Sequence, residues 1–379
     1  MFEQLSYNAL QGYWWLIISV LGASLVFMMF VQGGQSLIYS LGKKEPQLSL
    51  ILNAIGTRWD LSFTTLVVFG GAMFAAFPLF YSTSFGGAYW LWMLILFTFI
   101  LQAVSYEFRN KARNFLGAKT YEWFLFLNGL IGTISLGVAV GTFFTGGNFV
   151  HNDMNFVSWT TNWHGLEAFA NIKNLLLGFS IFFLARILAI LFLMNRVDDE
   201  QLYVKSKKQL LINAAVFLVF FLSFVFAILL GNGYAVDPAT QLVYVEKYKY
   251  FNNFIELPWL GILFLIGVVL VLLGIATPYL KNKKLETKGI WFAGFGTFFT
   301  VLALFLCLGY NNTVFYPSLV DLQSSLTIHN ASSSRYTLIV MSYVSLLVPF
   351  VAAYIIYTWR KLLKKKFTAD EISESDTAY

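Results

Sequence analysis

Residues 257–280 decide the fold, because the stretch LPWLGILFLIGVVLVLLGIATPYL contains no charged side chain. About 20 apolar residues in a helix cross the hydrocarbon core of a bilayer. The composition of the whole chain agrees, with 58% hydrophobic and 12% charged residues, whereas an ordinary soluble domain carries roughly a quarter charged residues. The sequence therefore predicts an integral membrane protein and argues against a water-soluble fold.

Eight further apolar stretches have the length of a membrane-spanning helix. They cover residues 13–41, 61–81, 88–106, 121–143, 174–194, 210–230, 289–308 and 336–359. The sequence thus predicts an all-α integral membrane protein with about nine transmembrane helices. We expect one polytopic transmembrane domain over residues 1–366. Residues 367–379 are acidic and polar, with too few apolar side chains to bury, and we expect a disordered cytoplasmic tail there.

The distribution of basic residues predicts the orientation of these helices. Twenty of the 25 lysines and arginines lie in alternate connections or in the C-terminal tail, and four lie on the opposite side. Because cytoplasmic loops are enriched in Lys and Arg, the basic side is expected to be cytoplasmic. An odd number of helices then puts the N-terminus outside and the C-terminus in the cytoplasm. The net charge of +6 follows from this topology and does not indicate a nucleic-acid partner.

Side chains that commonly bind metals or haem are scarce inside the predicted helices. His151, His164 and His329 all fall in connections expected outside the membrane. Met28 and Met29 lie within the first helix, where a flexible apolar side chain more often packs than ligates. We therefore expect no metal site, no catalytic residue and no directly bound haem in this chain.

Asp60 is the first ionisable residue of interest, because it lies where an amphipathic segment gives way to the second predicted helix. On the cytoplasmic side, a carboxylate there could take protons from water and pass them inward. The alternative is a structural N-cap, with the side-chain oxygen accepting from free N–H groups at the helix start. The two roles can coexist, and both stay open at this point.

Arg186 is the second candidate, because it lies inside the run SIFFLARILAILFLMNR, residues 180–196. Charged side chains within a membrane are costly and usually face the protein interior. We expect an acidic or carbonyl partner for Arg186, either as a structural ion pair or as part of an interface. Glu107 and Arg109 close the third predicted helix, where an exposed ion pair and a functional contact are the alternatives.

The C-terminal stretch SSLTIHNASSSRYTLIVMSYVSLLVPFVAAYIIYTWRKL, residues 324–362, resembles the last loop and helix of subunit II of the cytochrome bd quinol oxidases. The resemblance extends over nearly the whole chain. Further segments in that family's order are residues 12–15 at the start of the first helix, Trp59-Asp60 before the second, residues 74–78 with Tyr81 at its end, and Glu107-Phe108-Arg109 closing the third.

Two segments depart from the family's usual pattern. Gln32-Gly33-Gly34-Gln35 stands where the family usually has an acidic pair in a glycine-rich motif of the first helix. After Trp59-Asp60, the sequence Leu61-Ser62-Phe63-Thr64-Thr65 replaces a continuation that usually contains a glutamate and a tryptophan. The resemblance is thus to a divergent branch of the family.

The resemblance implies a haem-free subunit of an enzyme in the bacterial cytoplasmic membrane. Such an oxidase takes electrons from quinol and protons from the cytoplasm, and it reduces dioxygen to water. Haem b, haem d and the quinol site belong to the partner, subunit I. Subunit II stabilises that partner and helps to shape proton and oxygen access.

The same resemblance implies further partners: a structural quinone or lipid and a small single-helix subunit. We expect two four-helix bundles plus one peripheral helix. Asp60 is the candidate for proton transfer, while Trp59, Arg186, Glu107 and Arg109 are candidates for a buried ion pair or an interface. The alternatives are a secondary transporter, which would show paired repeats and broken helices near the midplane, and a membrane scaffold without redox activity.

Overall fold

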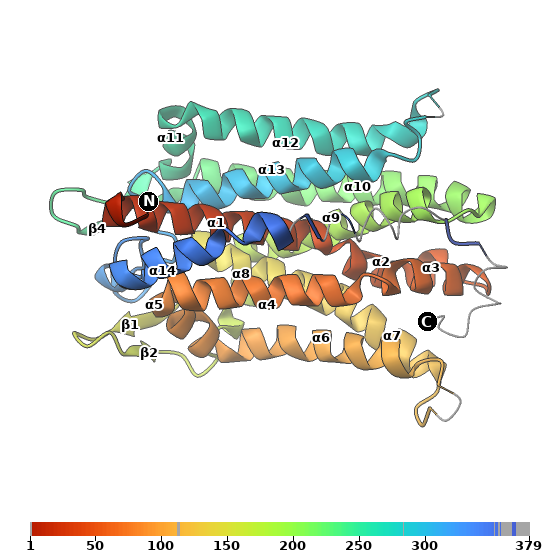
Figure 1. Cartoon of the computed structure of the whole chain (residues 1–379), viewed down its shortest axis with the longest axis horizontal. Coiled ribbons are helices and arrows are strands. Elements are labelled where there is room, and N and C mark those ends of the chain that lie inside the picture. Colours follow the sequence, from red (N-terminus) through yellow and green to blue (C-terminus); the bar gives the residue numbers. More distant parts are fainter. Residues whose placement is uncertain are drawn as a thin grey trace.

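The computed structural model describes residues 2–111, 114–282, 284–351, 353–354, 357 and 366–368. Eight helical segments in this part of the chain are long and apolar enough to cross a membrane. They lie side by side along the long axis of the molecule (Figure 1). The prediction of an all-α membrane fold is confirmed.

The N-terminal half holds four of these spans. Its elements are η1 (Phe2–Gln4), α1 (Tyr7–Met28), α2 (Phe30–Leu41), α3 (Gln47–Gly56), α4 (Trp59–Ala76), α5 (Pro78–Tyr81), the π-helical η2 (Ser82–Gly86), α6 (Tyr89–Phe108), α7 (Ala118–Leu127), the π-helical η3 (Asn128–Gly132) and α8 (Thr133–Thr145).

The C-terminal half holds the other four spans and all the strands in the described part. Its elements are β1 (Phe149–His151), β2 (Val157–Trp159), η4 (Leu166–Ala170), α9 (Ile172–Arg196), α10 (Glu200–Leu229), β3 (Asn232–Val236), β4 (Val243–Lys247), α11 (Lys249–Glu256), α12 (Pro258–Ala276), η5 (Thr277–Tyr279), α13 (Gly289–Gly309), η6 (Leu322–Ser324) and α14 (Arg335–Ser345).

The eight spans of the described part make two groups of four, which are defined by their order in the chain and not by separation in space. The first group contains α1 with α2, α4, α6 and the continuous run α7–η3–α8, and the second contains α9, α10, α12 and α13. Helices α8 and α2 pack on α9, and α1 packs on α13, so that one hydrophobic core joins the groups. Figure 1 shows α12 and α13 on one side and α4 and α6 on the other.

The ninth expected helix begins as α14. The apolar helical segment that includes α14 covers Arg335–Val351 and is shorter than each of the eight spans. Helix α14 lies against α1, where Tyr13 OH and Ser345 Oγ are 2.7 Å apart and Trp14 Nε1 donates to Ser342 Oγ. Much of the expected stretch beyond residue 351 lies outside the described residues.

Several predicted helices are interrupted in the structure. The first, expected as one helix over residues 13–41, starts at Tyr7 and is divided at Met29 into α1 and α2. The second begins at Trp59 and ends at Ala76, because Pro78 lacks the N–H that would continue the ladder. A π-helical turn, η3, separates α7 from α8.

Gly33 sets the distance between the two groups of helices. It lies on α2, and a Cβ atom built on it would collide with the carbonyl oxygen of Ala185 on α9. The backbones of α2 and α9 therefore touch directly, as small residues allow between membrane helices. This approach fixes the neighbouring Gln32 and Gln35 in position.

The two ends of the molecule differ. One end, called here the hairpin end, carries the antiparallel pairs β1–β2 and β3–β4 together with α11 (Figure 1). The sequence analysis predicts no strands in these connections. The other end, called here the α3 end, carries α3 and the short basic connections.

Phe367 is docked at the α3 end. Its N–H donates to Arg196 O at 2.8 Å, and its carbonyl accepts from Asp198 N. The guanidinium of Arg196 also lies over its ring. Phe367 was expected to begin the disordered tail, and residues 369–379 of that tail lie outside the described residues.

Candidate functional site

Asp60 lies at the α3 end, as the second residue of α4, and its side chain is exposed. The N-cap position belongs to Arg58. The capping role considered for Asp60 is therefore wrong, although a carboxylate in the first turn is still favoured by the helix dipole. Arg58 is buried and lies close enough to Asp60 to interact with its charge.

Trp59 connects this helix start to α6. Its indole stacks on the ring of Tyr106, with ring centroids 6.1 Å apart and an angle of 15° between the planes. Tyr106 is buried, and its hydroxyl accepts from Gln35 Nε2 at 3.2 Å. The start of α4 is thereby linked to polar groups inside the bundle.

Those polar groups form the amide cluster, which we define as Gln32, Gln35, Gln102 and Asn128. All four side chains are fully buried. The amide nitrogens of Gln32, Gln35 and Asn128 each lie 2.7 to 2.8 Å from Gln102 Oε1. Gln32 Nε2 also donates to Ser62 Oγ, and Asn128 Nδ2 to Gln35 Oε1.

Helices from different parts of the chain supply the amide cluster. Gln32 and Gln35 come from α2, Gln102 from α6 and Asn128 from η3. The sequence analysis identified the two α2 glutamines only as replacements for acids, and it missed Gln102 and Asn128. Uncharged amides within otherwise apolar spans were the available signal for both.

Arg109 forms the main ion pair at this end of the bundle. Its Nη2 is 2.9 Å from Glu122 Oε1 on α7, and its Nε also donates to that oxygen. Both side chains are buried. Glu45 contributes a more distant carboxylate, 3.7 Å from Nη2.

The structure does not bring Glu107 and Arg109 together. Residues two positions apart on a helix do not face each other, so Glu107 pairs instead with Lys111, one turn further on, and both are exposed. Glu122, the actual partner of Arg109, was not identified from the sequence.

Arg186 is half-buried between three helices. Its Nε donates to Asn213 Oδ1 on α10 at 2.7 Å, and its Nη1 donates to the carbonyl of Ser36 on α2 at 3.3 Å. Its guanidinium also lies over the ring of Phe182. Within the described ranges no carboxylate is within ion-pair distance of Arg186, and its partners are a carbonyl and an amide.

The three histidines lie at the hairpin end, outside the membrane-spanning helices. His151 has one ring nitrogen 2.9 Å from Thr83 Oγ1 and the other 3.1 Å from the carbonyl of Ser324. His164 stacks on Tyr89, and His329 Nδ1 is 2.9 Å from Gln11 Oε1. Burial lowers the pKa of both His151 and His329 below the ordinary value.

Comparison of the sequence with known protein families identifies the family of this chain. The model of the cytochrome bd terminal oxidase subunit II family matches residues 10–362, nearly the whole chain. The chain belongs to the cytochrome bd terminal oxidase subunit II family. It is accordingly part of a quinol:oxygen oxidoreductase complex and a multi-pass protein of the bacterial inner membrane, with a subunit I as its partner.

Individual relatives agree with this membership. The chain is 27% identical to cytochrome bd-I ubiquinol oxidase subunit 2 of Escherichia coli (strain K12), covering 98% of both chains. It is 28% identical to cytochrome bd ubiquinol oxidase subunit 2 of Bacillus subtilis (strain 168), covering 94% of this chain and 98% of the relative.

A solved structure of bd oxidase from Geobacillus thermodenitrificans has the same fold. The TM-score is 0.56, with 92% of this chain and 98% of that chain covered. The identity is 16%, so this likeness bears on the fold alone. Membership of the oxidase family argues against the two alternatives, a secondary transporter and a membrane scaffold without redox activity.

The oxidase complex implies haem. Haem iron is usually held by an axial His, Met, Cys or Tyr. The histidines are outside the spans, and Met28 and Met29 are packed in the hydrophobic core. Cys307 is buried in α13, against the side chain of Asn253.

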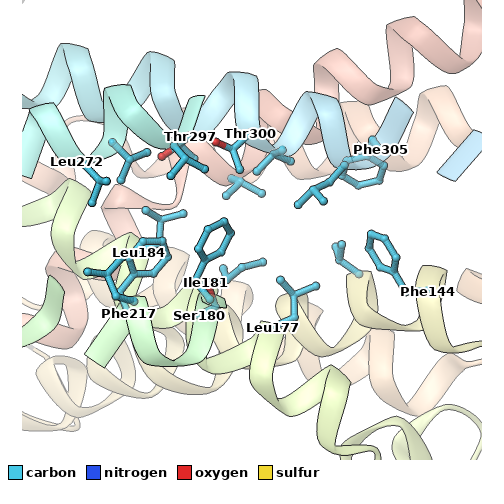
Figure 2. A pocket seen from close by; sticks show the side chains of 18 of the residues that line it. Phe144, Leu177, Ser180, Ile181, Leu184, Phe217, Leu272, Thr297, Thr300 and Phe305 are labelled. Atoms are coloured by element: carbon cyan, nitrogen blue, oxygen red, sulfur yellow. The ribbon is translucent and has the colours of Figure 1, made fainter. Parts of the chain in front are cut away.

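Subunit II also contains an apolar cavity of about 60 Å³ among α1, α8, α9, α10, α12 and α13. Figure 2 shows its walls extending from Leu184, Phe217 and Leu272 to Phe144 and Phe305. Thr297 and Thr300 add hydroxyl groups to the wall, and the Thr297 hydroxyl has no hydrogen-bond partner among the described residues.

Proposed function

We propose that this chain is the haem-free subunit II of a cytochrome bd-type quinol oxidase and stabilises the haem-bearing subunit I. The match to the family model over residues 10–362 is the observation that carries this proposal. It is supported by the placement of all three histidines at the hairpin end. Haem b and haem d are then held by the partner, which reduces dioxygen to water with electrons from quinol.

The proposed topology places the hairpin end outside the cell and the α3 end in the cytoplasm. The basic connections support this orientation. Asp60 then faces the cytoplasm at the start of α4, and it takes up protons for the reaction in subunit I. Its exposure supports exchange with water, and Ser62 and the amide cluster continue inward from it.

The partner surfaces are apolar helix faces. Helix α6 exposes Trp90, Met93, Phe97 and Ile100 along its length, and α12 exposes a similar row. Exposed apolar faces of this kind are suited to contact lipid, subunit I or a small single-helix subunit. We assign these faces to contacts with such occupants.

The apolar cavity in Figure 2 is proposed to hold one segment of a hydrocarbon chain, from a lipid or from a structural quinone. Its aromatic and aliphatic walls support a hydrocarbon occupant. The hydroxyl of Thr297 could donate to an ester or quinone carbonyl. An intact complex purified with bound quinone or lipid should therefore lose that molecule preferentially in a Thr297→Phe variant, which fills the cavity.

Asp60→Asn in the intact complex tests the role in proton uptake. The amide cannot carry a proton at this position, so oxygen consumption should fall several-fold while the haem content stays normal. Asp60→Glu should retain most of the activity. Glu107→Gln is the matched control, because Glu107 is an exposed carboxylate at the same end of the bundle. Normal turnover of Asp60→Asn across pH would remove Asp60 from the proton path.

A further inference from the structure

The amide cluster contains more donors than its central oxygen can accept. Three amide nitrogens, from Gln32, Gln35 and Asn128, converge on Gln102 Oε1. A carbonyl oxygen has two lone pairs, so one of these donors is in excess. The hydrogen bonding of the cluster therefore cannot be completed by its own side chains.

Three other polar atoms of the cluster are left over. Gln32 Oε1, Gln102 Nε2 and Asn128 Oδ1 are buried and have no hydrogen-bond partner among the described residues. Each side chain is 0% exposed. A buried polar atom without a partner costs about 1 to 3 kcal/mol, so three in one cluster point to a further hydrogen-bonding group.

Rotating all four amides together exchanges their oxygens and nitrogens and leaves three side chains around the terminal atom of Gln102. If all four amides rotate by 180°, Gln102 presents an NH2 group with two hydrogens to three acceptors. In that arrangement Gln32 Nε2, Gln102 Oε1 and Asn128 Nδ2 occupy the three outer positions. Three side chains therefore compete for the terminal atom of Gln102 in both of these arrangements.

The backbone is irregular on both sides of the cluster. The division between α1 and α2 falls at Met29, one turn before Gln32. The π-helical turn η3 begins at Asn128 itself. Helix breaks and π turns cost hydrogen-bond regularity and often occur at functional sites, and here both aim amide side chains at the same point.

We propose that the amide cluster is a binding site for ordered water within the membrane-spanning bundle. Water can both donate and accept, as two leftover acceptors and one leftover donor require. A bare cation would satisfy only the oxygens and would be repelled by the Gln102 amide donor. The amides are neutral, so the site holds water without placing a charge in the bilayer.

This inference stands on the cluster alone, and one consequence of it rests on the proposed function. Neutral amides do not readily accept and release protons, whereas water and hydroxyl groups do. Bound water beside Gln32 would continue a hydrogen-bonded path from Ser62 toward Tyr106. The replacement of acids by glutamines in this branch would then still leave a path for protons taken up at Asp60.

Radiolytic hydroxyl-radical labelling of the intact complex tests the site, because bound water generates radicals beside nearby aromatic rings. Tyr106 and Tyr250 are matched targets, with 4% and 1% of their surfaces exposed. Tyr106 contacts the cluster, whereas Tyr250 donates to the carbonyl of Phe144 at the hairpin end. Tyr106 should be oxidised several-fold faster than Tyr250.

The Gln102→Leu variant separates bound water from access of bulk solvent. Loss of the central amide should reduce the labelling of Tyr106 to the level of Tyr250. Ser62→Ala, a smaller change, provides a second variant if Gln102→Leu does not assemble, and it should reduce labelling partially. Equal labelling of Tyr106 and Tyr250 in the native complex would overturn the water site. That outcome is independent of the Asp60→Asn result, which tests proton uptake.

Discussion

Arg109, the C-cap residue of α6, and Glu122 on α7 are joined by two hydrogen bonds to a single carboxylate oxygen, at 2.9 and 3.1 Å. The pair closes the α3 end of the first group of helices, close to the stack of Trp59 on Tyr106. Because both side chains are buried, each depends on the other for compensation of its charge.

Replacing Glu122 by Gln should therefore destabilise the protein. Removing one partner of a buried pair costs about 3 to 5 kcal/mol, because it leaves the other charge uncompensated. The Glu45 carboxylate, 3.7 Å away, should reduce this loss. Thermal unfolding of the detergent-solubilised complex measures the effect. Glu107→Gln removes an exposed pair with Lys111 and should change stability by at most about 1 kcal/mol; equal shifts in the two variants would contradict this prediction.

Arg186 is expected to stabilise the junction of α2, α9 and α10. Its bonds to Asn213 and Ser36 are each worth about 1.5 to 3 kcal/mol. A charge within the membrane costs about 2.5 to 3.5 kcal/mol. Taken at the middle of their ranges, the two bonds outweigh the cost of the charge, so Arg186→Leu should lower the free energy of unfolding by about 1 to 2 kcal/mol. Arg186→Lys keeps the charge and should lie between that variant and the parent in melting temperature; a Leu variant that melts and assembles like the parent would exclude this role.

Gly33→Ala should disrupt the contact between the two groups of helices. The added methyl would collide with the backbone of Ala185, and overpacking typically costs about 1 to 3 kcal/mol. Gly71 on α4 is the matched control, because a Cβ there meets no atom within 4 Å. Gly71→Ala should be neutral or stabilising by up to about 1 kcal/mol. The yield of assembled complex and its melting temperature report both changes.

The stability of the hairpin end should depend on His151. Burial lowers the pKa of His151 in the folded protein, so the folded state binds fewer protons than the unfolded state. Its contribution is present above the ordinary pKa of about 6.5 and is lost as the pH falls through the lower, folded value. The melting temperature should fall between neutral and mildly acidic pH, and His151→Gln should flatten that dependence. An identical pH profile for the variant would contradict this assignment.

The sequence was sufficient to predict the membrane-spanning helices, because the length of an apolar stretch is a local property of the sequence. Eight of the nine predicted helices appear as full spans, and α14 begins the ninth. The interruptions within these helices were harder to predict from the sequence. Pro78 marks one of these interruptions in the sequence. No residue of that kind marks the break at Met29 or the π turn at Asn128.

The site was only partly predictable, because its contacts join distant segments. Asp60 and Arg186 stand out as charges at or within apolar runs. Glu122 and Gln102 acquire their importance only when α7 and α6 pack against their neighbours. A single sequence therefore identifies costly polar residues but does not reveal which of them meet.

An optical spectrum tests the central claim most directly. The intact complex, purified through a tag on this chain, should show the absorption of haem b and haem d. The chain expressed without its partner should be colourless, because its histidines lie outside the spans. Stoichiometric haem on the isolated chain, or a correctly assembled complex without any haem, would contradict the assignment of this protein as the haem-free subunit of a quinol oxidase.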